Sequence, residues 1–174
     1  ILRQSISFIG TALKFNATIT RLKSARQTFK DQEFPPTFPS LWGFGESRNY
    51  NKSTWQNYVW LRPTDIFHGP YHIYDKKIDP NDILQGQLGD CYFLSAIAAI
   101  AEYQDRIKKL FLTRAINCQG VFCIALCING VWEEVILDDL FPCETQGNRV
   151  AFNHSRGNEL WVMVLEKAWA KVNG

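Results

Sequence analysis

A continuous apolar run, Val121 to Ile128, is followed directly by Asn129-Gly130, and this combination limits the folds that the chain can adopt. An Asn-Gly pair after an apolar run is the strongest short-range sign of a two-residue β-hairpin, because both residues accept the positive φ of a type I′ turn. Val131 to Leu137 supplies the returning strand. We therefore expect an antiparallel strand pair over residues 121–137.

Helices are predicted on both sides of this hairpin. Residues 91–103 are apolar nearly all round, which is typical of a buried helix, and a short helix should follow over residues 105–112. The last helix is expected from about Asn158 to Val172, with Asn173-Gly174 as its C-terminal cap. Helices followed by strands and a final helix indicate the α+β class.

Proline and glycine mark the irregular parts of the chain. Residues 31–57 and 69–90 are rich in these residues and are predicted as loops. Between them lies a short apolar run, residues 58–61, and Pro63 then stands where an early helix position favours proline.

Charge is unevenly distributed along the chain. Residues 1–30 hold six of the 19 basic residues and no acidic residue, which leaves 13 basic against 17 acidic residues in the remainder. Apolar residues in this segment recur at helical spacing. Such a basic amphipathic helix could bind an acidic partner, lie on a membrane surface or act as a transit peptide, but packing on its own domain is the commoner role. The residues in question are Leu2, Ile6, Ile9, Leu13, Ile19, Leu22, Ala25 and Phe29.

Composition and pattern exclude several classes of protein. With 46% hydrophobic and 21% charged residues, the chain suits one globular domain and not a disordered chain or a coiled coil. The longest largely apolar stretch, Phe93 to Ala101, contains Ser95 and is far shorter than the ~20 residues of a membrane span. No signal peptide, phosphate loop or nucleic-acid-binding stripe is found, so we expect a cytoplasmic protein without a nucleic-acid partner. The glycosylation triplets at Asn16, Asn51 and Asn153 would matter only in a secreted protein.

The segment from Gln85 to Cys91 is the best candidate for a reactive site. Gly86 and Gly89 allow a tight turn, and Cys91 then opens the predicted buried helix. Amide groups and the dipole at a helix N-terminus stabilise a thiolate, so Cys91 is a candidate nucleophile. The side-chain amide of Gln85 and the backbone amide of Cys91 could form an oxyanion hole for acyl transfer. A buried structural cysteine is the alternative.

The other cysteines do not suit a metal site. Cys123 and Cys127 lie on one strand face, four residues and about 13 Å apart. That separation is too large for a shared zinc ion with bonds of ~2.3 Å. Together with Cys118 and Cys143, these residues are expected to be core cysteines.

The segment Gln85-Gly-Gln-Leu-Gly-Asp-Cys91-Tyr-Phe-Leu-Ser resembles the active-site signature of the calpain family of cysteine proteases. Further blocks match in order and cover residues 31–174, whereas residues 1–30 lie outside the resemblance. These blocks are Asp31-Gln-Glu-Phe-Pro-Pro36, Trp60-Leu-Arg-Pro63, Trp132 with Leu137-Asp-Asp-Leu140, Gly157-Asn-Glu-Leu-Trp161 and Leu165-Glu-Lys-Ala-Trp-Ala-Lys-Val-Asn-Gly174.

The resemblance implies a papain-like protease core of two subdomains, with this chain as the first. It makes Cys91 the nucleophile and Gln85 the oxyanion-hole donor, and it puts the catalytic His and Asn on the second subdomain. His68, His72 and His154 match no catalytic position. The expected partners are protein substrates, the second subdomain and a protein assembled through the N-terminal helix, and association with the cytoskeleton is one option. The alternative is an inactive calpain-like scaffolding module that binds another protein.

The resemblance also implies a calcium site in this half of the core, made by backbone carbonyls and two carboxylates. Asp82 and Glu159 match those carboxylates, and hard oxygen ligands are what Ca²⁺ requires. Lys76 and Lys77 stand near the carbonyl donors and should weaken cation binding. Pro80 replaces an arginine that pairs with the second subdomain in animal calpains. The alternatives are a loop-capping role for Asp82 and a first-turn helix charge for Glu159.

Overall fold

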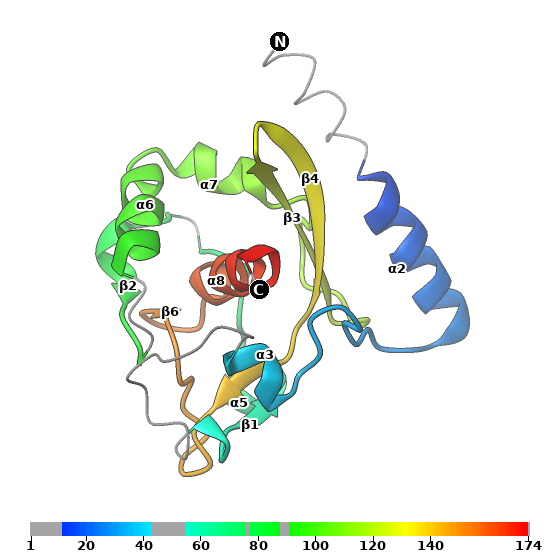
Figure 1. The fold of residues 1–174 in the computed structure, drawn as a ribbon, viewed down its shortest axis with the longest axis horizontal. Helices are drawn as coiled ribbons and strands as arrows, with labels where there is room; N and C mark the ends of the chain where they lie inside the picture. Colours follow the sequence, from blue (N-terminus) through cyan, green and yellow to red (C-terminus); the bar gives the residue numbers. More distant parts are fainter. Residues whose placement is uncertain (1–11, 43–54, 76, 88–90, 174) are drawn as a thin grey trace.

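The structure is a computed structural model that describes residues 12–42, 55–75, 77–87 and 91–173 (Figure 1). It has the α+β architecture that the sequence predicts. The described helices and strands follow in the order α2 (Leu13–Ala25), α3 (Phe38–Trp42), β1 (Val59–Leu61), α5 (Pro63–Ile66), a 3₁₀ turn (Pro80–Asp82), β2 (Ile83–Leu84), α6 (Cys91–Ala101), α7 (Gln104–Leu110), β3 (Val121–Ile128), β4 (Val131–Asp138), β5 (Phe141–Cys143), β6 (His154–Ser155) and α8 (Trp161–Asn173).

The predicted hairpin is confirmed. Strands β3 and β4 pair antiparallel from Val121 opposite Asp138 to Ile128 opposite Val131. Asn129 and Gly130 form the turn with φ of 50° and 83°, the positive values that a type I′ turn requires. The hairpin therefore follows directly from its turn residues and its apolar first strand.

Helix α8 lies at the centre of the molecule, with α6 and α7 on one side and the hairpin on the other (Figure 1). Its residues 161–168 are all buried. It begins three residues later than predicted, because the residues before it pair with another segment. The Leu160 amide donates to the His72 carbonyl at 3.0 Å, and the His72 amide donates to the Asn158 carbonyl at 3.0 Å.

Helix α6 is less buried than predicted. Phe93, Leu94, Ile97 and Ala101 face the core, but Tyr92 is 63% exposed and the small side chains of the opposite face are exposed too. The expectation of burial nearly all round is therefore wrong for the described residues. The helix lies at the edge of the molecule, so only one of its apolar faces meets the core (Figure 1).

Two short strand pairs lie in regions where the sequence predicts loops or gives no strand signal. Strand β1 pairs with β5, and β2 pairs with β6, so that Ile83 lies opposite Ser155 and Leu84 opposite His154. Helix α3 also lies within the predicted loop of residues 31–57, of which residues 43–54 lie outside the described residues. The β2–β6 pair matters most, because it fixes the start of the turn that carries Gln85.

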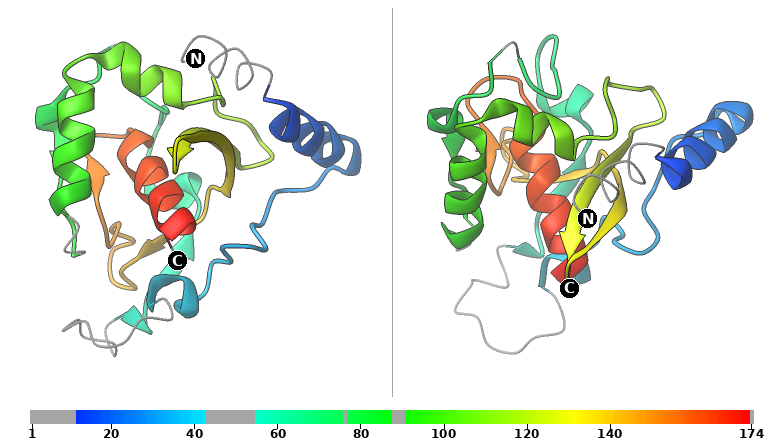
Figure 2. Two further views of the ribbon diagram at one scale, coloured as in Figure 1. Left: turned by 45° about the horizontal axis from the view of Figure 1, so that its top comes forward. Right: turned by 90° about the horizontal axis from the view of Figure 1, so that it is seen from above.

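Helix α2 packs against the outer face of the hairpin (Figure 2). Phe15 and Leu22 are buried there with Val121 and Cys123 of β3. The carboxylate of Glu134 in β4 accepts the amides at the start of the helix, from Lys14 at 3.4 Å and Phe15 at 3.0 Å. This segment therefore packs on its own domain.

The apolar face predicted for residues 1–30 is only partly correct. Ile19 and Phe29 pack at the edge of the α2 contact, whereas Ala25 is exposed and Leu13 is 64% exposed. Helix α2 ends at Ala25, since Arg26 adopts a left-handed conformation with φ of 53°. Leu2, Ile6 and Ile9 lie outside the described residues. Among the helices that the structure describes, none has the length and apolar character to cross a membrane.

Candidate active site

Cys91 is the first residue of α6, as the sequence predicts for a nucleophile at a helix N-terminus. The residue is exposed, so the alternative of a buried structural cysteine is wrong for this position. Its carbonyl accepts a hydrogen bond of 2.7 Å from the Ser95 hydroxyl one turn later. Residues 88–90, which join Cys91 to the glycine turn, lie outside the described residues.

Gln85 follows β2 directly and is exposed. Together with Gly86 and Gln87 it lines an open groove, whose lining also includes residues 144 and 147–151. Residue 86 must be glycine, because a Cβ atom there would overlap the carbonyl group of Phe152. The backbone of this turn, residues 85–87, therefore lies in direct contact with the segment that leads into β6. We call residues 85–87 the oxyanion turn, after the role that the sequence resemblance implies for Gln85.

Hydrogen bonds hold the oxyanion turn in place. The Gly86 amide donates to the side-chain oxygen of Asn153 at 2.9 Å, and the Gln87 amide donates to the Ala151 carbonyl at 3.1 Å. The side chain of Gln87 accepts from the Tyr58 hydroxyl at 2.5 Å and donates to Glu144 at 2.9 Å. Burial raises the pKa of Tyr58, and the nearby Glu144 carboxylate raises it further, so Tyr58 remains a donor at neutral pH.

No histidine contacts the Cys91 thiol in the part of the chain that the structure describes. His68 and His154 line the groove beside Gln85, and the Nδ1 atom of His154 lies 3.0 Å from the Phe152 carbonyl oxygen. His72 interacts through its backbone with the residues that precede α8. The described residues therefore present an exposed thiol and the turn of residues 85–87, and none of their histidines is placed as a general base for that thiol.

The two carboxylates expected at a calcium site lie close enough to influence each other. Glu159 is 9% exposed, and it accepts hydrogen bonds from the Asp75 amide at 2.8 Å and the Trp161 indole at 2.9 Å. Burial raises the pKa of Glu159, and the negative charges of Asp82 and Asp75 add to the rise against the effect of these hydrogen bonds. A cation would relieve this repulsion, and each Glu159 oxygen retains a lone pair for it.

Neither carboxylate has the capping position weighed as its alternative. Glu159 lies before the first turn of α8, so it is not a first-turn helix charge. Asp79, and not Asp82, caps the 3₁₀ turn by accepting the Asn81 amide at 3.0 Å. Among the described residues, no three His, Cys, Asp or Glu side chains converge as a metal site, so backbone carbonyls would have to complete the ligand set. Lys77 forms an ion pair with Asp79 at 3.1 Å, and Lys76 lies outside the described residues.

Of the remaining cysteines, only two are core residues. Cys123 and Cys143 are buried, and burial raises the pKa of both thiols, that of Cys143 to about 12. Cys118 and Cys127 are exposed, so the expectation of a core position is wrong for them. Cys127 escapes burial because it lies near the hairpin turn, at the exposed end of β3.

Sequence reasoning missed three buried polar side chains, of which two, Asn153 and Glu166, support the oxyanion turn. Asn153 stood out only as the start of a glycosylation triplet, yet it is fully buried. Glu166 and Lys167 interrupt the apolar residues of α8 and are themselves buried, at 7% and 6% exposure. Two adjacent charges among the otherwise apolar residues 161–170 were the available signal, because buried charges need dedicated partners.

Comparison with known proteins identifies the family. The model for calpain family cysteine proteases matches residues 29–174. The calpain-type cysteine protease ADL1 of Oryza sativa subsp. japonica is 36% identical over 158 residues, which make up 88% of this chain and 7% of that protein. The calpain-1 catalytic subunit of Sus scrofa is 40% identical over 151 residues, which make up 84% of this chain and 20% of that protein. The chain spans a small part of each relative, and it belongs to the calpain family of cysteine proteases.

Proposed function

We propose that this chain is the nucleophile-bearing subdomain of a calpain-type endopeptidase that acts on protein substrates. The observation that carries the proposal is the pair formed by an exposed Cys91 at the start of α6 and a hydrogen-bonded oxyanion turn that begins at Gln85. Both residues match the signature of a family to which the chain belongs. A second subdomain would supply the His and Asn that complete the site.

In the proposed reaction, the Cys91 thiolate forms a bond to the substrate carbonyl carbon, and the carbonyl electron pair moves to the oxygen. The Gln85 side chain and the Cys91 amide stabilise that oxyanion. Collapse of the intermediate breaks the peptide C–N bond, and the departing amine takes a proton from the histidine of the second subdomain. Water then hydrolyses the thioester and restores the thiol.

A scaffolding module without activity is the second candidate. The α2 contact on the hairpin supports it, because a helix outside the family match is built onto the domain. The intact Cys91 and Gln85 favour the protease, since binding a partner requires neither residue. We therefore place protein substrates and the second subdomain first among the proposed partners, and the cytoplasm as the proposed location.

Hydrolysis of a fluorogenic peptide tests the protease proposal. This chain alone should turn over no peptide, whereas the chain joined to a second subdomain should do so. In the active form, Cys91→Ala should abolish hydrolysis, and Gln85→Ala should lower kcat by about 10²–10³. Hydrolysis by the chain alone that disappears in Cys91→Ala would contradict the assignment of the base to the second subdomain. Hydrolysis that survives Cys91→Ala would refute the nucleophile.

We also propose that Asp82 and Glu159 bind Ca²⁺ together with backbone carbonyls. The mutual repulsion of the carboxylates near Glu159 supports this proposal, because a bound cation would remove it. The lysines in the adjacent loop should keep the affinity low, with a Kd on the order of 10⁻⁴ M. Since Glu159 precedes α8 and Asp82 precedes β2, the ion would tie the strand before Gln85 to the central helix.

Thermal unfolding in the presence of Ca²⁺ tests the metal proposal. At a hundredfold excess over Kd, binding should add about 2.7 kcal/mol to the free energy of unfolding. For a domain of this size that corresponds to a rise in Tm of roughly 5–11 °C. Mg²⁺ should raise Tm less, and Asp82→Ala should abolish the effect. A Tm unchanged by about 10 mM Ca²⁺ would show that the two carboxylates are structural.

A further inference from the structure

Besides the bonds of the Gln87 side chain to Tyr58 and Glu144, the backbone of the oxyanion turn is attached to the segment that leads into β6. The β2–β6 pair ends with Leu84 opposite His154. The attachment then continues through the Gly86 amide, which donates to Asn153, and the Gln87 amide, which donates to the Ala151 carbonyl. Of these links, only the one through Asn153 uses a side chain, so a substitution can remove it without changing the backbone.

The buried carboxylate of Glu166 fixes the orientation of the Asn153 side chain. The Asn153 amide nitrogen Nδ2 donates to Glu166 Oε1 at 2.6 Å, and the Asn153 backbone amide donates to Glu166 Oε2 at 3.2 Å. A carboxylate only accepts hydrogen bonds, so the NH₂ group of Asn153 has to face Glu166. The oxygen Oδ1 is thereby directed to the Gly86 amide, for which it is the required acceptor.

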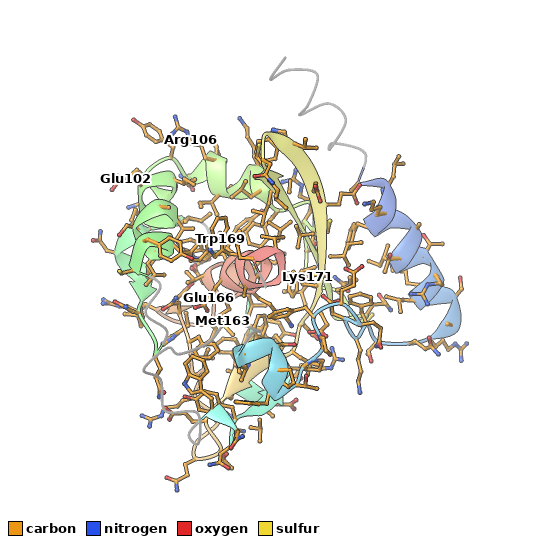
Figure 3. The ribbon with its side chains drawn as sticks, in the orientation of Figure 1. Glu102, Arg106, Met163, Glu166, Trp169 and Lys171 are labelled. Atoms are coloured by element: carbon orange, nitrogen blue, oxygen red, sulfur yellow. The ribbon has the colours of Figure 1, made fainter. Side chains whose placement is uncertain are left out.

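Glu166 connects this contact to the centre of the fold. It projects from α8 (Figure 3), within the run of residues 161–168 that is buried throughout. Asn153 is fully buried, so water does not compete for its hydrogen bonds. A chain of hydrogen bonds therefore leads from the most buried helix to the backbone of the oxyanion turn.

We propose that Asn153, oriented by Glu166, is a positioning residue that holds the oxyanion turn in the geometry required for acyl transfer to Cys91. The proposal rests on the proposed protease function and adds residues to it that the active-site signature does not contain. Asn153 does not touch substrate. It acts through the Gly86 backbone on the neighbouring Gln85, whose side-chain amide needs a defined position to stabilise an oxyanion.

The test compares two reactions of Cys91 in the folded chain. Acylation by p-nitrophenyl acetate forms a thioester and releases p-nitrophenolate through an oxyanion intermediate. Alkylation by iodoacetamide displaces iodide in one step and forms no oxyanion. The ratio of the two rates at Cys91 therefore reports on oxyanion stabilisation and does not need the second subdomain. Mass spectrometry of the Cys91 peptide, in a Cys118→Ser and Cys127→Ser background, isolates the relevant thiol.

Three variants define the expected pattern. Gln85→Ala removes the donor itself and should lower the acylation-to-alkylation ratio. Asn153→Ala should lower the ratio by about tenfold, and amide hydrogen exchange at Gly86 should become faster. Glu166→Gln keeps the side-chain volume but replaces one acceptor by a donor, which favours a flipped Asn153 amide. It should therefore lower the ratio as well, and it serves as the second variant should Asn153→Ala fail to unfold cooperatively.

Ser155→Ala is the matched control. Ser155 is buried in the same segment, two residues from Asn153, and its hydroxyl has no hydrogen-bond partner in the described part of the chain. This variant should leave both the ratio and the Gly86 exchange rate unchanged.

Two results would overturn the proposal. One is a normal ratio in a folded Asn153→Ala variant when Gln85→Ala lowers it, because the oxyanion hole would then be intact without Asn153. The other is Gly86 exchange that is unchanged in Asn153→Ala, because the turn would then not depend on this contact. A ratio that Gln85→Ala leaves unchanged would instead count against the role of Gln85 in the proposed function, and Gly86 exchange would still decide whether Asn153 holds the turn.

Discussion

Replacing Lys167 by methionine should strongly destabilise the folded chain. The side chain of Lys167 is 5% exposed, and its ammonium group forms an ion pair with the fully buried carboxylate of Asp138. It also donates to the carbonyl oxygens of Asp138 at 3.2 Å and Leu140 at 2.7 Å, so all three of its protons have acceptors. Burial lowers the pKa of Lys167, and the Asp138 carboxylate acts against that shift.

The size of the effect follows from what methionine leaves behind. Methionine fills a similar volume, so no large cavity forms. Asp138 keeps the amides of Asp31 at 2.8 Å and Leu140 at 3.1 Å as donors, but its charge loses the buried counter-ion. Removal of one partner of a buried ion pair costs about 3–5 kcal/mol. For a domain of this size, Tm should fall by roughly 6–20 °C.

Chemical unfolding in urea, followed by tryptophan fluorescence, measures this change. The midpoint should fall while the slope m stays constant, since the change in exposed surface is the same. Lys109→Met on α7 is the control, because Lys109 is exposed and the change should stay within about 0.5 kcal/mol. The double variant Lys167→Met with Asp138→Asn should recover part of the loss, because no unpaired charge remains. A loss below about 1 kcal/mol in Lys167→Met would refute the reasoning.

Three further predictions follow from single sites. Cys91 should be alkylated by iodoacetamide before the other thiols, and faster labelling of Cys118 or Cys127, mapped by mass spectrometry, would contradict its special position. Because burial raises the pKa of Glu159 above its ordinary value of 4.5, the folded state binds more protons there than the unfolded state. This contribution to the free energy of unfolding is complete below pH 4.5 and is lost as pH rises through the pKa of Glu159 in the folded state. Tm should therefore fall over that pH range, and Glu159→Gln should make the fall smaller. Glu134→Gln should weaken the cap of α2 by about 0.5–2 kcal/mol and speed amide exchange in that helix, whereas unchanged exchange would show that apolar packing alone holds α2.

The elements that the sequence predicts well are those whose signal is local. The Asn129-Gly130 turn defines its own hairpin, and Pro63 occupies the first position of α5, where its missing amide costs nothing. The short strands β2 and β6 have no such signal. Each has two residues, so pairing with the other is the reason that either is extended. That pairing joins residues about 70 positions apart, which periodicity does not detect.

The residues of the candidate site also fall into two groups, those with a local sequence signal and those without one. Cys91 and Gln85 are found from the glycine turn and from a resemblance, because both belong to one continuous segment. The support of Gln85 comes from Asn153 and Glu166, which lie far along the chain and meet only in the folded structure. The burial of α6 differs from the sequence-based expectation for a related reason. An apolar pattern shows that a helix face can be buried, but it does not show which faces pack against other parts of the chain.

Helix α8 brings these observations together, because consecutive residues on it serve different parts of the molecule. Glu166 supports the oxyanion turn through Asn153, whereas Lys167 supports the end of the hairpin through Asp138. Adjacent residues can contact different parts of the molecule because neighbouring helix positions point in directions about 100° apart. Lys167→Met should therefore lower the free energy of unfolding and leave the acylation-to-alkylation ratio of Cys91 unchanged under conditions where the chain is folded. Glu166→Gln should lower that ratio. If the ratio instead fell in proportion to the free energy of unfolding in both variants, α8 would act on the site only by holding the fold together.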